Sequence, residues 1–452
     1  MDYTEFSKGY SYPTEMRGLS AKQIAAEMKC GWNLGNSLES ENNETYWGNP
    51  KTTKVMIDKI AEKGFKTLRV PVRWDNNYTD SNYSISNDDM NRVETVINYG
   101  LSNNMYVIIN IHHNAIQTMV NNDQSIQKRV KDELSKVWTQ ISNRFKNYGD
   151  KLIFEIINEP RFNEDWDGNS SFYDILNSYN EVARSTIRST GGNNAKRLIL
   201  LPTYCASSDK KKILGWKNLS DDQMTAVSIH AYKPFNFAFD GNGHSEWNKY
   251  DEKELSDLFE DLNNTFLKKG VTVVMGEFGS VNKNNIQQRV FHASKYSKIA
   301  KSLGIPCLWW DNNCFGTGAE QFGIFDRKKL EFKYGNIADS IINAFNGVPD
   351  QAESININTN TTHTQPYTEI FSGSASSSNW GQAVSIETLK HDGPFDCFDM
   401  DPNGYFYAEY SGKQKEIELI LQSWTGSNIW AKVEPSESGN ANGHFYSKFS
   451  YK

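Results

Sequence analysis

Apolar segments of strand length alternate with amphipathic segments eight times between residue 30 and about residue 345. Segments such as 52–64 and 87–104 place apolar residues at helical spacing and close on Gly or Asn, which commonly end helices. Strands that are apolar along their whole length are typical of a parallel sheet covered on both faces. The pattern predicts an α/β protein with a (β/α)8 TIM barrel. The predicted strands are 30–36, 66–72, 105–112, 152–158, 197–203, 226–232, 271–278 and 305–311.

The sequence pattern changes after residue 347. Residues 348–366 are rich in Asn and Thr and lack periodicity, which is typical of a linker. From residue 367 to residue 452, short alternating runs are broken by turn-forming clusters such as DPNG and TGSN, which predicts a small all-β sandwich. We therefore expect a barrel over 1–347, a linker over 348–366 and a β-sandwich over 367–452.

Charge and composition exclude several classes of protein. The net charge is −7, with 48 Lys and Arg against 55 Asp and Glu, and no basic block that would follow a phosphate backbone, so we expect no nucleic-acid partner. No apolar run approaches the length that crosses a bilayer, and the first residues lack the pattern of a signal peptide. The five cysteines are widely spaced without a C-x-x-C pair, which favours neither a disulfide framework nor a zinc site.

Polar and aromatic residues gather where the predicted strands end, which is the edge that carries the reactive groups of such barrels. For a single residue such as His112 or Trp309, packing in the core explains its position as well as a functional role does. The residues at this edge are Arg69, His112 or His113, Asn158, Glu159, His230, Tyr232, Glu277, and Trp309 or Trp310.

Two of the acidic residues suit the cleavage of a glycosidic bond. Glu155 and Glu159 lie four residues apart, roughly 13 Å along a strand, so they cannot act on one bond. We expect Glu155 to be a paired structural acid, and Glu277 to face Glu159 across the barrel. A retaining mechanism needs a separation of about 5 to 5.5 Å between its two carboxyl groups.

The adjacent histidines His112 and His113 argue against a metal-dependent hydrolase. Neighbouring residues of a strand point to opposite faces, so one of the two should leave the barrel, and H-x-H spacing is missing. We expect no metal and no cofactor.

The ordered motifs GWNLGNSLE, YWGNPKTT, LRVPV, NIHHN, FEIINEP, SIHAY, VMGEFG and WWDNN resemble those of glycoside hydrolase family 5, in its branch of bacterial endoglucanases and xyloglucanases. The resemblance runs from about Cys30 to Phe345. It implies a retaining mechanism with Glu159 as acid/base and Glu277 as nucleophile. It also implies a substrate-binding set of Arg69, His112, Asn158, His230, Tyr232, Trp310, Trp47 and Asn33. In that set Arg69 bonds the nucleophile, Asn158 holds the sugar 2-hydroxyl, Tyr232 points toward Glu277, and Trp310 forms a floor for the sugar.

Strand parity in the small domain singles out two tryptophans. Trp424 and Trp430 fall on the polar faces of their predicted strands, on either side of a short turn, and together resemble the platform of a carbohydrate-binding module. The alternative is that they cover a domain interface. Trp380 shares its parity with apolar residues and is expected in the core.

These observations predict a secreted, monomeric endo-β-1,4-glucanase whose partners are plant cell-wall β-glucan polysaccharides: cellulose-type chains, mixed-linkage β-glucan and, as a further candidate, xyloglucan. The high aromatic content, 13% of residues, suits sugar faces. A mannanase or xylanase on the same fold is the alternative enzyme, and a non-catalytic glucan-binding protein is the alternative of another class.

Overall fold

The computed structural model describes residues 12–348, 405–410, 419–422, 430–441 and 444–450. The chain divides into two units, Met1–Thr359 and Asn360–Lys452, which are taken separately below. The segment 348–366 lies almost wholly outside the described residues, so the linker boundaries stay a prediction.

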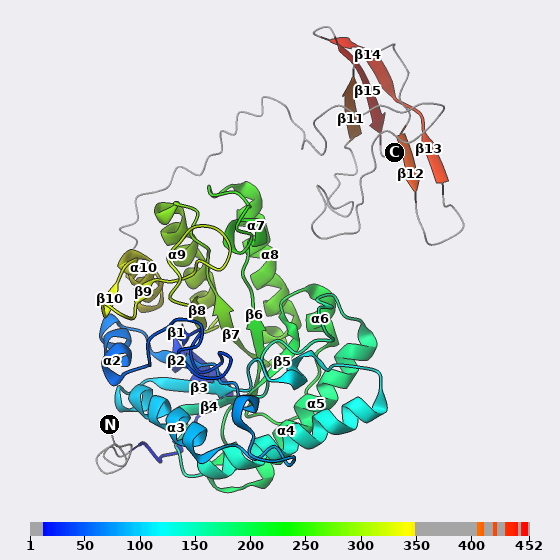
Figure 1. Cartoon of the computed structure of the whole chain (residues 1–452). Coiled ribbons are helices and arrows are strands. Elements are labelled where there is room, and N and C mark those ends of the chain that lie inside the picture. The colour runs from blue at the N-terminus through cyan, green and yellow to red at the C-terminus, as the bar shows by residue number, and fades with distance from the viewer. Residues whose placement is uncertain (1–11, 349–404, 411–418, 423–429, 442–443, 451–452) are drawn as a thin grey trace. The chain divides into compact units, whose positions relative to one another are not determined.

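The first unit is a closed barrel of eight parallel strands in sequential order, which confirms the predicted fold (Figure 1). Nearly every strand residue is buried, as expected for a sheet that lines a core and is covered by helices. The strands are β1 (Cys30–Leu34), β2 (Thr67–Val70), β3 (Tyr106–Asn110), β4 (Leu152–Glu155), β5 (Ile199–Ser207), β6 (Thr225–His230), β7 (Thr272–Phe278) and β8 (Cys307–Asp311).

Helices follow each strand and cover the outside of the barrel (Figure 1). Side chains cap the first turns of α2 and α3: Thr53 and Ser86 each accept a bond from a backbone amide. Gly64 and Gly347 end α2 and α10 with a positive φ that suits glycine. The helices are α1 (Ala21–Met28), α2 (Lys54–Lys63), α3 (Asn87–Ser102), α4 (Gln124–Arg144), α5 (Ser170–Ser189), α6 (Lys210–Gly215), α7 (Phe235–Ala238), α8 (Lys249–Thr265), α9 (Ile286–Ser302) and α10 (Gly335–Asn346).

The lower end of the barrel interior is a small hydrophobic core. Ile108, Ile153 and Leu308 pack there against Met28 of α1. Side chains alternate along a strand, so residues two positions further on point into the same interior, one layer nearer the C-terminal edge. Glu155 follows Ile153 by two residues, and Trp310 follows Leu308 by two. Both side chains therefore point into the barrel interior, one layer above this hydrophobic core.

The second unit contains antiparallel strands, in agreement with the predicted all-β domain. Strands β11 (Tyr405–Tyr410), β15 (His444–Ser450) and β14 (Glu437–Ala441) form one sheet, and β12 (Leu419–Gln422) pairs with β13 (Trp430–Val433). Trp380 and Trp424 lie outside the described residues. Trp430 belongs to β13, but its side chain is not described, so the platform prediction stays untested.

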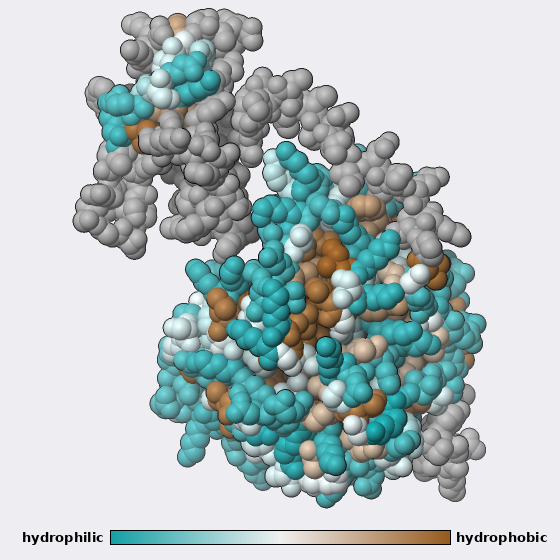
Figure 2. All heavy atoms as spheres, turned by 180° about the vertical axis from the view of Figure 1, so that it is seen from behind, coloured by the Kyte–Doolittle hydropathy of each residue, from teal (hydrophilic) through white to brown (hydrophobic). Residues whose placement is uncertain are grey.

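Most of the barrel surface visible in Figure 2 is hydrophilic, with the largest group of hydrophobic residues in its upper middle part and smaller hydrophobic patches elsewhere on that face. Within the described part of the chain, no helix combines the length and the apolar character needed to cross a membrane.

Candidate active site

Arg69 of β2 is the centre of a buried network and is fully inaccessible to solvent. Its guanidinium donates to Oε2 of Glu155 at 2.8 Å and to Oε1 of Glu277 at 2.6 Å. It also donates to Oδ1 of Asn33 at 3.0 Å and to Oδ1 of Asn158 at 2.9 Å. Burial lowers the pKa of Arg69, but the charges of Glu155 and Glu277 outweigh burial and raise the pKa overall, so the cation persists.

Glu155 is a paired structural acid, as predicted. Besides the Arg69 bond, its carboxylate accepts from Nδ2 of Asn110 at 2.9 Å and from the hydroxyl of Ser228 at 2.5 Å. Burial alone would raise its pKa, but Arg69 and His230 lower the pKa overall, so the group stays ionised. Glu155 is 1% exposed and both its oxygens accept bonds from these neighbours, which fits a supporting role.

Glu277 lies within β7 near its C-terminal end and is 4% exposed. Oε1 receives the Arg69 bond, and Oε2 accepts a bond from the Tyr232 hydroxyl at 2.7 Å, so Tyr232 points toward Glu277 as predicted. Burial and the charge of Glu277 raise the pKa of Tyr232 well above its usual value, which keeps the hydroxyl a donor. Glu277 is therefore held by two donors on its two oxygens.

Glu159 lies four residues beyond the end of β4, which corrects the prediction that it ends the strand. The strand pairing stops at Glu155, and Glu159 has a φ of 35°, a conformation that turns the chain away from the strand direction. The backbone on both sides is anchored: the amide of Asn158 donates to Ile111 O at 2.8 Å, and the amide of Cys205 donates to Pro160 O at 2.9 Å. The Glu159 side chain is 21% exposed, so water reaches it.

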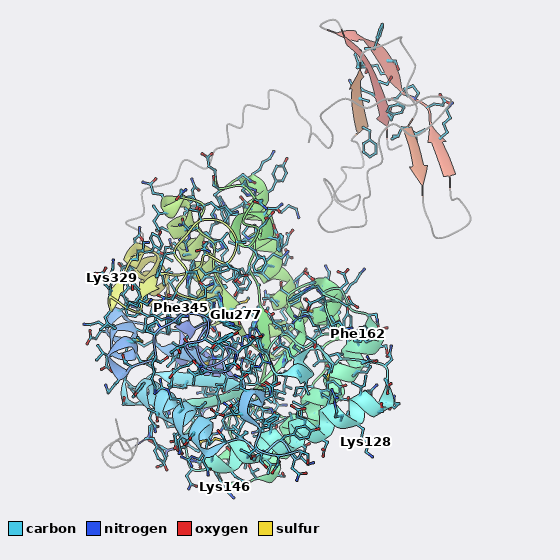
Figure 3. All side chains as sticks on the ribbon, viewed as in Figure 1. Lys128, Lys146, Phe162, Glu277, Lys329 and Phe345 are labelled. Atoms are coloured by element: carbon cyan, nitrogen blue, oxygen red, sulfur yellow. The ribbon has the colours of Figure 1, made fainter. Side chains whose placement is uncertain are left out.

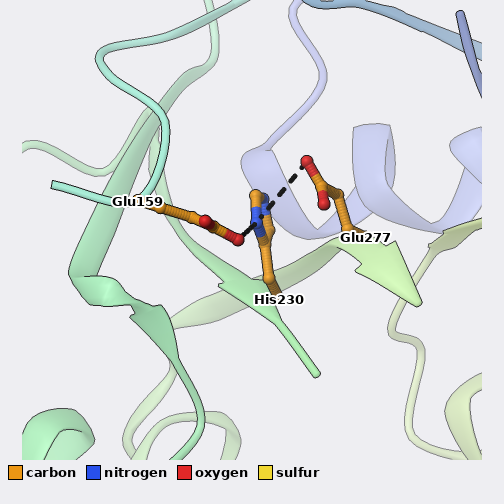
Figure 4. A group of neighbouring side chains, drawn as sticks. All are labelled: Glu159, His230 and Glu277. Atoms are coloured by element: carbon orange, nitrogen blue, oxygen red, sulfur yellow. Dashed lines mark hydrogen bonds and ion pairs between the residues drawn. The ribbon is translucent and has the colours of Figure 1, made fainter. Parts of the chain in front are cut away.

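His230 lies between the two carboxylates (Figure 4). Its Nδ1 is 2.9 Å from Oε1 of Glu159 and 3.6 Å from Oε1 of Glu277. Burial lowers the pKa of His230, but the charge of Glu277 and the bonds with Glu155 and Glu159 outweigh it and raise the pKa to about 9. The imidazole therefore carries a positive charge at neutral pH.

One ligand atom each from Glu159, His230 and Glu277 lies within 4.8 Å of the other two. The nearest oxygens of the two carboxylates are thus within that distance, which suits the close spacing of a retaining glycosidase rather than the wider spacing of an inverting one. The same three groups form a possible metal site by geometry. Arg69 adds a positive charge beside this group, with Nη1 2.6 Å from Oε1 of Glu277.

His112 and Trp310 form one wall of the site. Their rings stack with centroids 6.1 Å apart and planes inclined by 22°. Trp310 is 8% exposed and packs with Tyr232, Val281 and Phe322. Trp309 points the other way, is fully buried, and donates to the carbonyl of Phe322, so it belongs to the core.

Of the two adjacent histidines, His112 is buried and His113 is exposed, in line with the prediction that one of the pair leaves the barrel. Their ring centroids are 4.4 Å apart, and His113 also meets Trp47 edge-on at 5.6 Å. Strand β3 ends at Asn110, and His113 has a φ of 60°, so the alternation of a strand does not apply to this pair. Trp47 is 39% exposed and lies beside the histidines.

The two asparagines of the predicted set both accept hydrogen bonds from the Arg69 guanidinium. Asn33 is fully buried, and its amide donates to the carbonyls of Gly276 and Trp309 while its oxygen accepts from Arg69. Asn158 is 2% exposed and is oriented by its bond from Arg69. The geometry of Asn33 is that of a support for Arg69.

Sequence reasoning missed Asn110 and Ser228, the two further partners of Glu155. Strand parity offered a signal for both, because Ser228 precedes His230 by two residues and Asn110 follows Ile108 by two.

A closed (β/α)8 barrel with two carboxylates facing each other at the C-terminal edge of its strands defines a glycoside hydrolase. Residues 33–316 match the sequence profile of the cellulases, glycosyl hydrolase family 5, and residues 371–452 match carbohydrate binding module 65 domain 1. The chain belongs to the cellulase family, glycosyl hydrolase family 5, and carries a carbohydrate-binding module after the barrel.

Named relatives agree with this assignment. Endoglucanase B of Clostridium cellulovorans is 44% identical over 329 residues, which cover 70% of this chain and 74% of the relative. Endoglucanase A of Ruminococcus albus is 39% identical, covering 73% of this chain and 93% of the relative. A solved GH5-4 broad specificity endoglucanase from Clostridium cellulovorans is 49% identical with a TM-score of 0.72, covering 75% of this chain and all of that one. A solved GH5 lichenase from Caldicellulosiruptor sp. F32 is 36% identical with a TM-score of 0.69, covering 75% of this chain and 98% of that one.

Proposed function

We propose that this protein is a retaining endo-β-1,4-glucanase in which Glu277 attacks the anomeric carbon and Glu159 protonates the leaving group. The observation that carries the proposal is the asymmetry of two close carboxylates: Arg69 and Tyr232 both donate to Glu277, while Glu159 bonds His230 and remains partly exposed. A nucleophile must be ionised, and two donors favour that form. Glu159 would act first as an acid and then as a base in each cycle, so its carboxyl group must exchange protons with water.

The balance of charge in the buried cluster supports the same assignment. Glu155 and Glu277 contribute two negative charges, and Arg69 and His230 contribute two positive charges. The cluster is neutral when Glu159 holds a proton. After Glu159 gives that proton to the glycosidic oxygen, its new negative charge lies 2.9 Å from the His230 cation, which stabilises it. Water can then return a proton to Glu159 as it attacks the covalent intermediate.

The remaining residues form the proposed binding site. Trp310 offers the aromatic floor for the reacting sugar, and His112 holds that floor by stacking. Asn158 lies between Arg69 and Glu159, where it suits contact with the sugar 2-hydroxyl. Trp47 offers an exposed ring further along the mouth. We assign Asn33 to positioning Arg69.

The substrates proposed are cellulose-type chains and mixed-linkage β-glucan. Relatives named endoglucanase and a relative named lichenase both match most of the barrel, which supports this proposal. Xyloglucan is proposed as a further substrate. A mannanase or xylanase is the alternative enzyme, because the same carboxylate pair on this fold serves several polysaccharide backbones. We further propose a secreted, monomeric enzyme that acts on plant cell-wall polysaccharide.

The C-terminal segment is proposed to tether the enzyme to its polymer. Its match to a carbohydrate-binding module supports a sugar-binding role, and Trp424 with Trp430 are the proposed contact residues. The proposed boundaries are 1–347 for the barrel, 348–366 for the linker and 367–452 for the module.

The test is a comparison of initial rates on carboxymethylcellulose, mixed-linkage glucan, xyloglucan, mannan and xylan, with Glu277→Gln as the inactive control. We expect hydrolysis of the first two polymers. Activity on mannan or xylan alone would replace the proposal by the alternative enzyme, and activity on none would favour a binding protein.

A further inference from the structure

We propose that Tyr204, in an irregular stretch of β5, is a positioning residue that holds the proposed acid Glu159 in line with the glycosidic oxygen. Tyr204 is 1% exposed, so it acts through the backbone of the loop that carries Glu159, the acid loop of residues 159–168, and not by contact with the sugar. The inference rests on the proposed function, because it requires Glu159 to be the residue that protonates the leaving group.

The acid loop has no helix or strand to keep Glu159 in place. Strand β4 ends at Glu155 and helix α5 begins at Ser170. Glu159 itself has a φ of 35°, a conformation that a residue with a side chain keeps only where surrounding contacts impose it. The position of the acid therefore depends on the contacts of the loop with its neighbours.

The side chain of Tyr204 holds the acid loop at three points. Its hydroxyl accepts a hydrogen bond from the amide of Phe162 at 3.0 Å and donates one to the carbonyl of Asp165 at 2.7 Å. Its ring lies against Gly168, where an added Cβ would be only 2.6 Å from the ring. Burial raises the pKa of Tyr204, so the hydroxyl keeps the proton that it donates. Both the donor and the acceptor function of this hydroxyl thus serve the acid loop.

Aromatic packing supports the same loop from the side of α5. Phe162 lies outward from Glu277 (Figure 3), and its ring packs on Phe172 of α5 with centroids 5.4 Å apart. The Phe172 ring in turn stacks on Tyr204 at 6.2 Å, with the planes inclined by 11°. Tyr204 therefore contacts the loop through hydrogen bonds and, by way of Phe172, through packing.

Cys205, the next residue of β5, adds two contacts to the acid loop. Its amide donates to the carbonyl of Pro160, directly after Glu159, at 2.9 Å. Its thiol donates to the carbonyl of Trp166 at 3.5 Å, and burial raises the pKa of the thiol, which keeps it a donor. Two consecutive residues of one strand thus bind the loop near its beginning and near its end.

These contacts are possible because β5 departs from a regular strand. Its pairing with β6 stops after Pro202 and resumes at Ser207, opposite His230. In between, Cys205 and Ala206 have φ values of 57° and 49°, which are unfavourable for residues with a Cβ. Side chains of a regular strand alternate between two faces, whereas this bulge brings two neighbours to the same loop. The bulge ends beside the histidine that bonds the proposed acid.

The acid and the nucleophile are held by different parts of the molecule, so the two can be disturbed separately. Glu277 is fixed by bonds from Arg69 and Tyr232, whereas Glu159 depends on the acid loop. A displacement of about 1 Å can lower a rate by roughly two orders of magnitude. A small shift of the acid loop should therefore slow proton transfer at Glu159 and spare the attack by Glu277.

The experiment compares the full-length protein with Tyr204→Phe, which deletes the hydroxyl and keeps the ring. Tyr148→Phe is the matched control, because Tyr148 is also 1% exposed and its hydroxyl bonds Glu94 at 2.8 Å. Two substrates separate the two carboxyl groups. The sugar leaving group of cellohexaose must be protonated, whereas the dinitrophenolate of 2,4-dinitrophenyl β-cellobioside departs without a proton. For both substrates kcat/KM reports the first step, the formation of the covalent intermediate.

We expect Tyr204→Phe to lower kcat/KM on cellohexaose about tenfold, the effect of losing one or two ordinary hydrogen bonds, and to leave the dinitrophenyl substrate unchanged within about twofold. Cys205→Ala, which deletes only the thiol contact, should show the same substrate dependence with a loss of about two- to threefold. Azide should raise kcat of Tyr204→Phe on the dinitrophenyl substrate, because azide attacks the covalent intermediate without a base. Tyr148→Phe should change neither rate.

Equal losses on both substrates in the folded variants would overturn the positioning role, and so would an undiminished rate on cellohexaose. Should Tyr204→Phe fail to fold, the substrate dependence of Cys205→Ala decides the question. Glu159→Gln is the reference, with a larger loss on cellohexaose and little loss of kcat/KM on the dinitrophenyl substrate. If Glu159→Gln slows both substrates alike, the assignment of the acid fails and this inference falls with it. Equal losses in the β5 variants alone overturn only the inference, so the two failures are distinguishable.

Discussion

The imidazole Nδ1 of His230 lies 2.9 Å from Oε1 of Glu159, so a buried cation touches the proposed acid. The same nitrogen is 3.6 Å from Glu277, and Nε2 is 3.8 Å from Glu155. One histidine thus balances three carboxyl groups, which explains why its charged form is favoured despite complete burial of its ring.

The charge of His230 should appear in the stability of the protein. Its folded-state pKa of about 9 exceeds the ordinary 6.5, so its contribution is complete below about pH 6.5 and is lost as the pH rises through about 9. The difference corresponds to roughly 3 kcal/mol. Urea unfolding across this range should show the loss, and His230→Gln should abolish it. His244→Gln, at a half-exposed histidine, is the control and should keep the pH dependence. If the His230 signal itself titrates near pH 6.5, the prediction is contradicted.

Neutralising either catalytic carboxylate should stop the reaction without unfolding the protein. Glu277→Gln and Glu159→Gln are each expected to lower kcat by several orders of magnitude, because one removes the nucleophile and the other the acid. Azide should restore Glu159→Ala and yield a β-glycosyl azide. The exposed Glu62→Gln on α2 is the control. An α-configured first product of the wild type, observed by NMR, would end the retaining assignment.

Removing the Tyr232 hydroxyl should affect Glu277 alone. Tyr232→Phe keeps the ring packed on Phe239 and Phe322 but deletes the 2.7 Å bond to Oε2. A hydrogen bond to a charged group is worth about 1.5 to 3 kcal/mol, so kcat should fall about ten- to a hundredfold. The acid limb of the pH profile should move to higher pH, because the ionised carboxylate loses a donor. Tyr296→Phe, whose hydroxyl bonds the carbonyl of Ala231, should leave that limb in place.

Arg69→Met should destabilise the fold as well as the site. It leaves Glu155 and Glu277 buried without their cation, a loss of about 3 to 5 kcal/mol in the free energy of unfolding. Adding Glu155→Gln should recover part of that loss, since it removes one of the two unpaired charges. Urea denaturation measures both variants, and strictly additive losses would argue against the pairing.

The C-terminal module should bind glucan by itself. The isolated segment 367–452 is expected to be retarded by xyloglucan or mixed-linkage glucan in affinity electrophoresis. Replacing both Trp424 and Trp430 by Ala should abolish retardation and leave Tm unchanged, whereas Trp380→Ala should lower Tm by removing a core ring. Normal retardation of the folded double variant would place the binding face elsewhere, with Tyr405 and Tyr407 next to test.

The sequence by itself determined the barrel and the two acids. Continuous apolar strands with amphipathic helices between them specify a parallel sheet covered on both faces, and its strands end at one common edge. That reasoning was enough to place Glu159 and Glu277 opposite each other. It also gave Glu155 and Glu159 different roles, although the strand spacing on which this rested ends at Glu155.

Only the tertiary structure decided how these residues are connected. Parity states which way a side chain points within a strand, but β3 and β4 end before His113 and Glu159, and a positive φ at both residues breaks the alternation. The distances across the barrel depend on its closure and register, which no local pattern encodes. For that reason the position of His230 between the acids, and the contacts of Arg69 with Glu155, Glu277, Asn33, Asn158 and His230, emerged only from the folded chain.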